Sequence, residues 1–476
     1  MTLRRRCRTK GHRQSITLKP QTLFLPFTLF FAFLLRLPSL FEPYWYGDEG
    51  IYQVIGQALS SGRLLYAGIW DNKPPFLYLL YGVFNGDQFS MRAVSLLFMM
   101  AAIISFYFLS RELFKKPRVV NLTTGLFAFL FAIPLLEGNI ANAENFMLFP
   151  IILAMLLAFR GHFIAAGLLL STAFLFKIVA IFDFAALLTF LFIVSFPKKL
   201  KEWLREDFFL AAGFTLPIIL TVFYFVSKGI FVDFLTATFS QNVTYIGLQT
   251  ALFIKLFFLA VFCFAVFFFK EKLKRQHLFI YIWFGFSLFN ALFGARPWIH
   301  YLLTLLPAWC LFVGFIIENK KLRLINTVVL LVLFAIMSTN FWVYGKTIFY
   351  YGNFLGKVTG RITTEEYRGS FDWFVNRDYA VASYIIANSD KDDTIFVWGD
   401  NPQIYALSGR LPPGRYTVSY HVTFYPNALL ETKEAIAQKK PKLILAVRED
   451  IPQVLLDLSY ELKNEIKGVK IYERRN

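Results

Sequence analysis

The sequence is poor in cysteine and in charged residues. Only three of its 476 residues are cysteines, Cys7, Cys263 and Cys310, and their positions suggest neither a disulfide framework nor a cysteine-based metal motif. Charged residues make up 17% of the chain, against about 25% in an average soluble domain. Apolar residues make up 57% and form long runs. This composition excludes a disordered or fibrous chain and a small disulfide scaffold, and it argues against an ordinary cytosolic enzyme.

Acidic residues are scarcer than basic ones, and the imbalance is confined to one part of the chain. The first 345 residues hold 31 Lys and Arg against 15 Asp and Glu, whereas residues 346–476 hold 18 against 16. The basic residues of the first part form clusters between apolar runs. A nucleic-acid-binding protein would gather them on one solvated face. Their separation by apolar segments favours the positive-inside rule of membrane proteins, with the basic clusters and the N-terminus in the cytoplasm.

The apolar runs are long enough to cross a bilayer, which takes roughly 20 residues. Eleven spans are predicted: 21–40, 88–111, 119–136, 146–160, 162–178, 181–197, 207–227, 251–270, 277–293, 300–318 and 323–345. The first follows a basic segment, as a signal peptide would, but no small-residue cleavage site follows it, so we expect a retained helix. The stretch 74–85 is too short to cross easily. We expect it to be half-inserted on the outer side, because a crossing there would move every later basic cluster to the wrong side.

The chain changes character near residue 380, where strand-like and helix-like segments begin to alternate. Strands are expected at 394–398, 443–446 and 469–472, and helices at 401–408, 427–439 and 451–464. This alternation indicates a small α/β domain. The predicted organisation is a basic cytoplasmic tail (1–19), a transmembrane domain (20–345), a connecting segment (346–379) and an extracytoplasmic α/β domain (380–476).

The first predicted outer loop holds the most informative residues. Asp48 stands at the start of an amphipathic helix, where it could cap the helix or present a carboxylate that accepts a proton at the water–lipid boundary. Lys73 precedes two prolines that would open the half-inserted helix. A lysine there could extend its ammonium to the membrane surface or bind a phosphate at headgroup level. Both alternatives stay open for each residue.

The order of these motifs resembles the GT-C membrane glycosyltransferases, in particular the protein O-mannosyltransferase and lipid A aminoarabinose transferase branch (glycosyltransferase family 39). The resemblance rests on Asp48-Glu49 followed by Lys73-Pro74-Pro75. It extends over about residues 20–320 through further motifs: Arg36-Leu37, Gly62, Ala141-Asn142-Ala143-Glu144, Gly294 to Tyr301 and Pro307.

The resemblance implies a polytopic α-helical GT-C fold and transfer of a sugar from a polyprenyl-phosphate carrier to an acceptor outside the cytoplasm. It implies that Asp48 is the catalytic base, that Glu49 completes the motif, and that Glu144 is a second acid of the site. It also implies that Lys73 contacts the carrier phosphate.

The chemistry of a phosphate leaving group supports the same reading from the residues. Its developing charge needs cations, and Lys73, Arg296, Lys177 and His300 are all predicted on the outer side. Snorkelling to the membrane surface, or an ordinary interfacial position, remains the alternative for the last three. No nucleotide-binding motif is evident, and a sugar phosphate donor requires none.

The leading hypothesis is therefore an inverting glycosyltransferase of the plasma membrane with no nucleic-acid partner. The acceptor, whether protein, lipid or glycan, stays open, and so does a divalent cation, because the outer loops hold acids without a diagnostic ligand spacing. A transporter or flippase of lipid-linked sugars is the alternative. It would favour charges inside the membrane and paired broken helices, and neither is evident.

Overall fold

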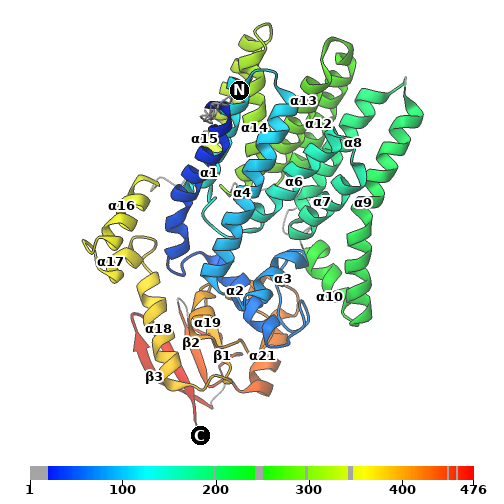
Figure 1. Cartoon of the computed structure of the whole chain (residues 1–476). Helices are drawn as coiled ribbons and strands as arrows, with labels where there is room; N and C mark the ends of the chain where they lie inside the picture. Colours follow the sequence, from blue (N-terminus) through cyan, green and yellow to red (C-terminus); the bar gives the residue numbers. More distant parts are fainter. Residues whose placement is uncertain are drawn as a thin grey trace, which may run out of the picture.

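A computed structural model describes residues 20–197, 199–241, 250–294, 298–340, 347–447, 450–456 and 459–475. The basic tail predicted at 1–19 lies outside the described residues, and so does Arg296. The described chain is a helical bundle with a small sheet layer at one end (Figure 1).

Each predicted span coincides with a helix. These are α1 (Pro20–Arg36), α4 (Gln88–Leu113), α5 (Pro117–Ala132), α6 (Ala143–Phe159), α7 (Phe163–Phe176), α8 (Ile181–Ser195), α9 (Leu200–Ser227), α12 (Thr250–Phe268), α13 (Arg275–Ala291), α14 (Tyr301–Glu318) and α15 (Arg323–Asn340). Five described segments are long and apolar enough to cross a membrane: Leu23–Phe41, Gln88–Leu113, Ile178–Ser195, Leu200–Ser227 and Tyr301–Glu318. The protein is thus a helical membrane protein, and the total of eleven crossings stays a prediction.

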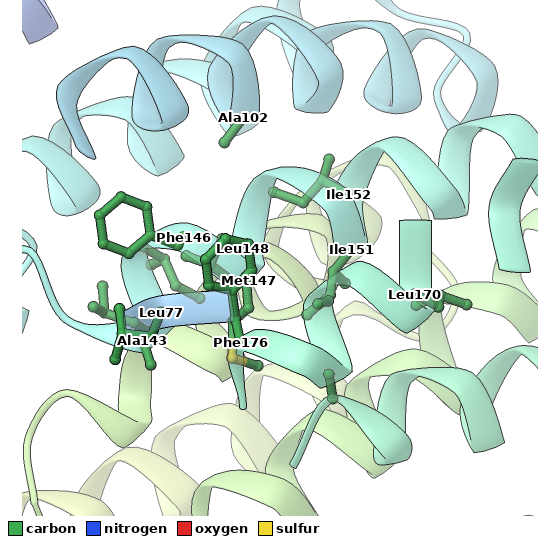
Figure 2. Close-up of a cluster of buried hydrophobic side chains, with 14 of the residues drawn as sticks. Leu77, Ala102, Ala143, Phe146, Met147, Leu148, Ile151, Ile152, Leu170 and Phe176 are labelled. Atoms are coloured by element: carbon green, nitrogen blue, oxygen red, sulfur yellow. The ribbon is translucent and has the colours of Figure 1, made fainter. Parts of the chain in front are cut away.

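The centre of the bundle is α6, which packs against α4 on one side and α7 on the other. Its apolar residues surround the whole helix instead of forming one stripe, as expected for a helix enclosed by others. Figure 2 shows Phe146, Ile151 and Ile152 of α6 among side chains from neighbouring helices. This packing holds the N-terminus of α6, which carries Glu144, at a fixed place at one end of the bundle.

Two short helices lie at that same end. Helix α2 (Gly47–Ser60) packs against α3 (Pro75–Val83). With nine residues, α3 extends only about 14 Å, too little to cross a bilayer. Its length agrees with the half-inserted helix expected at 74–85, and Pro75 occupies its first position.

The C-terminal sheet has the strand order β1-β2-β4-β3. Strand β1 (Ile395–Trp398) runs parallel to β2 (Leu443–Ala446), while β4 (Val469–Arg474) pairs antiparallel with both β2 and β3 (Tyr460–Ile466). The layer also contains four helices: α18 (Val375–Asn388), α19 (Gln403–Ser408), α20 (Ser419–Phe424) and α21 (Ala428–Lys439). Helix α18 spans residue 380, where the sequence places the domain boundary. Within the predicted connecting segment lie α16 (Thr347–Val358) and α17 (Thr364–Gly369).

The helix predicted at 451–464 is wrong, because residues 460–466 form strand β3. The two residues that join β3 to β4, Lys467 and Gly468, have φ values of 48° and 82°. Positive φ at both central residues is the signature of a tight hairpin turn. This turn and the pairing with β4 outweigh the helix propensity of the Glu and Lys residues in the segment.

The sheet layer contacts the helical part through α2 (Figure 1). Gly50 lies so close to α19 that a Cβ built on it would be 2.9 Å from Pro402 and 3.1 Å from the backbone nitrogen of Gln403. Gln57 donates a hydrogen bond from its side-chain amide to the carbonyl of Ala406 at 3.0 Å. One face of α2 is therefore held by the C-terminal layer, and this contact fixes the helix that begins beside Asp48.

Candidate active site

A cavity of about 700 Å³ lies where the starts of α2 and α6 meet the chain that precedes α3. Five of the residues singled out in the sequence line it: Asp48, Lys73, Glu144, Lys177 and His300. Four side chains of α20 and the residue after it complete the wall: Tyr420, Thr423, Phe424 and Tyr425. The lining residues, from Tyr46 to Tyr425, are up to 379 positions apart in the sequence and surround one space.

Asp48 lies in the first turn of α2 and is not its cap. The helix begins at Gly47, with Tyr46 in the N-cap position. The Asp48 carboxylate accepts a hydrogen bond from the Tyr52 hydroxyl at 3.1 Å and lies 3.5 Å from the Lys73 ammonium. Partial burial opposes its charged form, but Lys73 together with His300 and Tyr52 outweighs burial and lowers the pKa of this carboxyl. With its side chain 38% exposed, Asp48 is a charged carboxylate that a substrate can reach.

Lys73 lies between two carboxylates. Its ammonium is 3.5 Å from Asp48 and 3.7 Å from Asp71. Burial disfavours its charged form, but Asp48 and Asp71 raise the pKa of Lys73 above its ordinary value. Its backbone is held on both sides, since its N–H donates to the Tyr78 hydroxyl and its carbonyl accepts from the Tyr66 hydroxyl. The ammonium therefore stays charged, and the backbone that carries it is fixed, while the side chain itself is held by the two ion pairs.

A second charged cluster forms the opposite part of the cavity wall. Glu144, in the first turn of α6, is fully buried and pairs with Lys177, which follows the last residue of α7. His300 lies 3.8 Å from Glu144 through Nε2 and 2.9 Å from Glu137 through Nδ1. The Tyr46 hydroxyl donates to Glu137 at 2.7 Å. Glu144 thereby holds two cationic or protonatable groups toward the cavity.

Glu49 has a different environment from its neighbour Asp48. It is buried and accepts hydrogen bonds from Arg92 at 2.9 and 2.6 Å and from the backbone N–H of Ala141 at 3.0 Å. Arg92 also pairs with Glu42 at 2.8 Å. Glu49 is absent from the cavity wall. It joins α2 to α4 and to the loop before α6, so its contacts are those of a residue that positions the site.

Arg296 lies outside the described residues, but Gly294 and Trp298 on either side of it line the cavity. Sequence reasoning missed four polar residues of the site: Tyr46, Tyr52, Asp71 and Glu137. Asp71 and Glu137 could have been found, because each is an acid in a loop predicted on the outer side. The two tyrosines carried no such signal, since the chain has 23 of them.

The loop from Trp398 to Pro402, which follows strand β1, contributes to the site indirectly. Asp400 accepts hydrogen bonds from the Ser419 hydroxyl at 2.6 Å and the Tyr420 backbone N–H at 3.1 Å, so it caps α20. Within the described part of the chain, no three His, Cys, Asp or Glu side chains are grouped so that they could hold a metal ion.

No protein-family model matches the chain, and no curated protein matches it either. Among solved structures, it is similar to ArnT from Cupriavidus metallidurans bound to undecaprenyl phosphate. The two superpose with a TM-score of 0.57 over 95% of this chain and 97% of that one, at 16% identity. The chain has the ArnT fold. The similarity covers nearly the whole chain and agrees with the fold that the sequence resemblance implies.

Proposed function

We propose that the protein transfers a sugar from a polyprenyl-phosphate donor to an acceptor hydroxyl on the extracytoplasmic side of the membrane, with inversion at the anomeric carbon. The observation that carries the proposal is the pairing of Asp48 and Lys73 at 3.5 Å on the wall of a cavity that Lys177 and His300 also line. A base for the acceptor and cations for the leaving phosphate are the groups that this reaction requires.

The reaction is a single displacement. Asp48 takes the proton of the acceptor hydroxyl while the acceptor oxygen forms a bond to the anomeric carbon. The bond from that carbon to the phosphate oxygen breaks, and the electron pair leaves with the polyprenyl phosphate. Because the acceptor enters opposite to the leaving group, the configuration inverts.

Lys73 stabilises the phosphate charge in this scheme. In the structure its ammonium is shared between Asp48 and Asp71. When a donor phosphate binds, Lys73 turns toward it, which frees an oxygen of Asp48 for the acceptor. Lys177, paired with Glu144, supplies further positive charge, and His300 offers a ring nitrogen as a hydrogen-bond partner. Arg296 is proposed as another phosphate ligand.

A polyprenyl-phosphate donor suits the position of the cavity at the end of an apolar helical bundle, because each buried methylene of a lipid tail contributes about 0.8 kcal/mol to binding. The similar ArnT structure holds undecaprenyl phosphate, which supports the same class of lipid here. The proposed acceptor is a protein, a lipid or a glycan. The proposed location is the plasma membrane. A transporter would favour charges within the membrane. The charges of this site gather at one end of the bundle, so the site does not favour the transporter alternative.

The test is an assay of purified protein with a radiolabelled polyprenyl-phosphate sugar and a set of candidate acceptors. Asp48→Asn keeps the size of the side chain and removes the base, so we expect transfer to fall about 10²- to 10⁴-fold. Lys73→Ala should weaken donor binding. Asp87→Asn is the matched control, because Asp87 is an acid of the same region that caps α4 and does not line the cavity. Equal sugar transfer by the wild type and Asp48→Asn would refute the catalytic assignment.

A further inference from the structure

A second and larger cavity, of about 1570 Å³, lies at the other end of the bundle, away from the sheet. It is lined where α4 ends and α5 begins, where α12 ends and α13 begins, and at the turn between α14 and α15. Figure 1 shows α4 running from the α2 end of the molecule toward this far end. Nothing in the proposed transfer reaction uses this cavity.

The lining is strongly basic. It contains seven Lys and Arg side chains: Arg111, Lys115, Lys116, Lys272, Lys274, Lys320 and Lys321. The two acids of the lining are both engaged, since Glu112 pairs with Arg160 at 2.9 Å and Glu318 accepts from the Lys115 backbone N–H at 3.3 Å. All six lysines of the lining are exposed and form no side-chain hydrogen bond or ion pair within the described chain: Lys115, Lys116, Lys272, Lys274, Lys320 and Lys321.

The positive-inside rule explains why basic residues lie on this side, but not why they meet. The rule acts on each loop separately. Here three clusters that are remote in sequence, 111–118, 270–275 and 320–323, face one cavity. In another cluster, none of the described residues Lys199 to Arg205 lines the cavity. Like charges brought together repel one another unless an anion lies between them, so the convergence points to a ligand.

The apolar part of the lining identifies the class of that ligand. Phe262, Val266 and Phe269, at the end of α12, also line the cavity. One turn earlier on the same face of α12, Phe258 is 65% exposed, and α15 exposes Leu324 and Ile325 by 78% and 64%. Basic side chains next to such apolar ones fit a molecule with an anionic head and hydrocarbon chains. A soluble polyanion would leave the apolar side chains unused.

We propose that this cavity binds the headgroup of an anionic glycerophospholipid from the leaflet predicted to be cytoplasmic, with the acyl chains lying along α12 and α15. Basic pockets between membrane helices on that side suit such headgroups. The site is distinct from the donor site, which lies at the other end of the bundle and offers its cations already paired with acids.

The test measures binding of phosphatidylglycerol and phosphatidylcholine to the full-length protein in detergent by native mass spectrometry. We expect phosphatidylglycerol to be retained and phosphatidylcholine to be lost. The combined variant Lys116→Gln, Lys320→Gln, Lys321→Gln should bind phosphatidylglycerol at least tenfold more weakly. The combined variant Lys199→Gln, Lys201→Gln, Arg205→Gln is the control, since it removes the same charge from the same predicted side and should change binding less than twofold.

Three further measurements test whether the site requires positive charge, acyl chains and an intact donor site. The triple Lys→Arg variant at 116, 320 and 321 should retain binding, which separates lost charge from misfolding. Glycerol phosphate, which lacks acyl chains, should not compete, and Asp48→Asn should bind the phospholipid normally whether or not it transfers sugar. Equal loss in both Gln variants, competition by glycerol phosphate, or preference for polyprenyl phosphate over phosphatidylglycerol would each overturn the proposal.

Discussion

At the scale of single residues, Asp48 and Glu49 show how neighbours in sequence take separate tasks. On a helix, adjacent side chains point about 100° apart, so Asp48 faces the cavity while Glu49 faces α4. Asp48 keeps partial access to solvent, and Glu49 is buried against Arg92. The adjacent pair therefore supplies both a reactive carboxylate and the anchor that holds it in place.

The pairing of Asp48 with Lys73 predicts a pH effect. Lys73 lowers the pKa of Asp48, so the base should stay charged toward the acidic end of the profile of kcat/KM against pH. In Lys73→Met the cation is gone and the pKa of Asp48 rises. Activity, which needs the deprotonated base, should then begin to fall at a higher pH than in the wild type. The measurement is kcat/KM against pH, with the exposed Lys228→Met as the control. An acid limb at the same pH in both variants would contradict the prediction.

At the scale of elements, α7 and α9 cross with their backbones in contact. A Cβ built on Gly167 would lie 2.2 Å from the carbonyl oxygen of Leu210, and one on Gly213 would lie 2.3 Å from that of Ile164. Small residues at helix crossings allow this approach in membrane proteins, where packing drives association. The crossing fixes the end of α7, after which Lys177 reaches Glu144.

A single methyl group added at this crossing should lower the free energy of unfolding. We expect Gly213→Ala to destabilise the protein by about 1–3 kcal/mol, because the added carbon collides with backbone that cannot move aside. Gly125→Ala, in α5, is the control, since its added Cβ meets only Phe24 at 3.9 Å. Thermal unfolding in detergent would compare the two variants. An equal midpoint for both would show that the crossing is not tightly packed.

At the scale of the whole molecule, the C-terminal layer closes the proposed catalytic cavity. Trp70, just before Asp71, packs edge-on to His421 and Tyr425 with ring centroids 4.9 and 4.4 Å apart. The Trp70 backbone N–H donates to the carbonyl of Arg415 at 2.9 Å. The chain between α2 and α3 is thus held between the bundle and the layer, and α20 becomes part of the cavity wall.

This interface should weaken in acid. Burial is the main cause that lowers the pKa of His421 to about 4, while nearby Asp71 opposes it and Lys73 adds to it. An unfolded histidine has a pKa near 6.5. As pH falls, the unfolded state therefore binds the proton first, and stability is lost from about pH 6.5 to about pH 4.

His421→Gln should reduce this loss of stability, measured as the difference between the unfolding midpoints at pH 7.5 and pH 5. His162→Gln, at an exposed histidine, should leave it unchanged. An identical acid-induced loss in wild type and His421→Gln would refute the role of His421.

The sequence predicted the elements that form through local patterns, and it failed for those that depend on contacts between residues far apart in the chain. The helices at the eleven predicted spans followed from local hydrophobicity, and β1, β2 and β4 from local patterning. Strand β3 was mistaken for a helix because its conformation depends on pairing with β4, a partner that a charged, exposed segment does not reveal by its own pattern. Likewise, Asp71 escaped notice because its importance comes from Lys73 and from His421, which is 350 residues away.

The sequence by itself determined that the chain enters a membrane, that basic clusters separate its apolar runs, and which acids and cations stand in the loops. These properties depend only on residues that are neighbours in the sequence, so they can be predicted without knowledge of the tertiary structure. Only the tertiary structure decided that Asp48, Lys73, Glu144, Lys177 and His300 share one cavity, that Glu49 lies outside it, and that three basic clusters meet at the other end. Such proximity depends on how helices pack, through contacts between residues far apart in the chain.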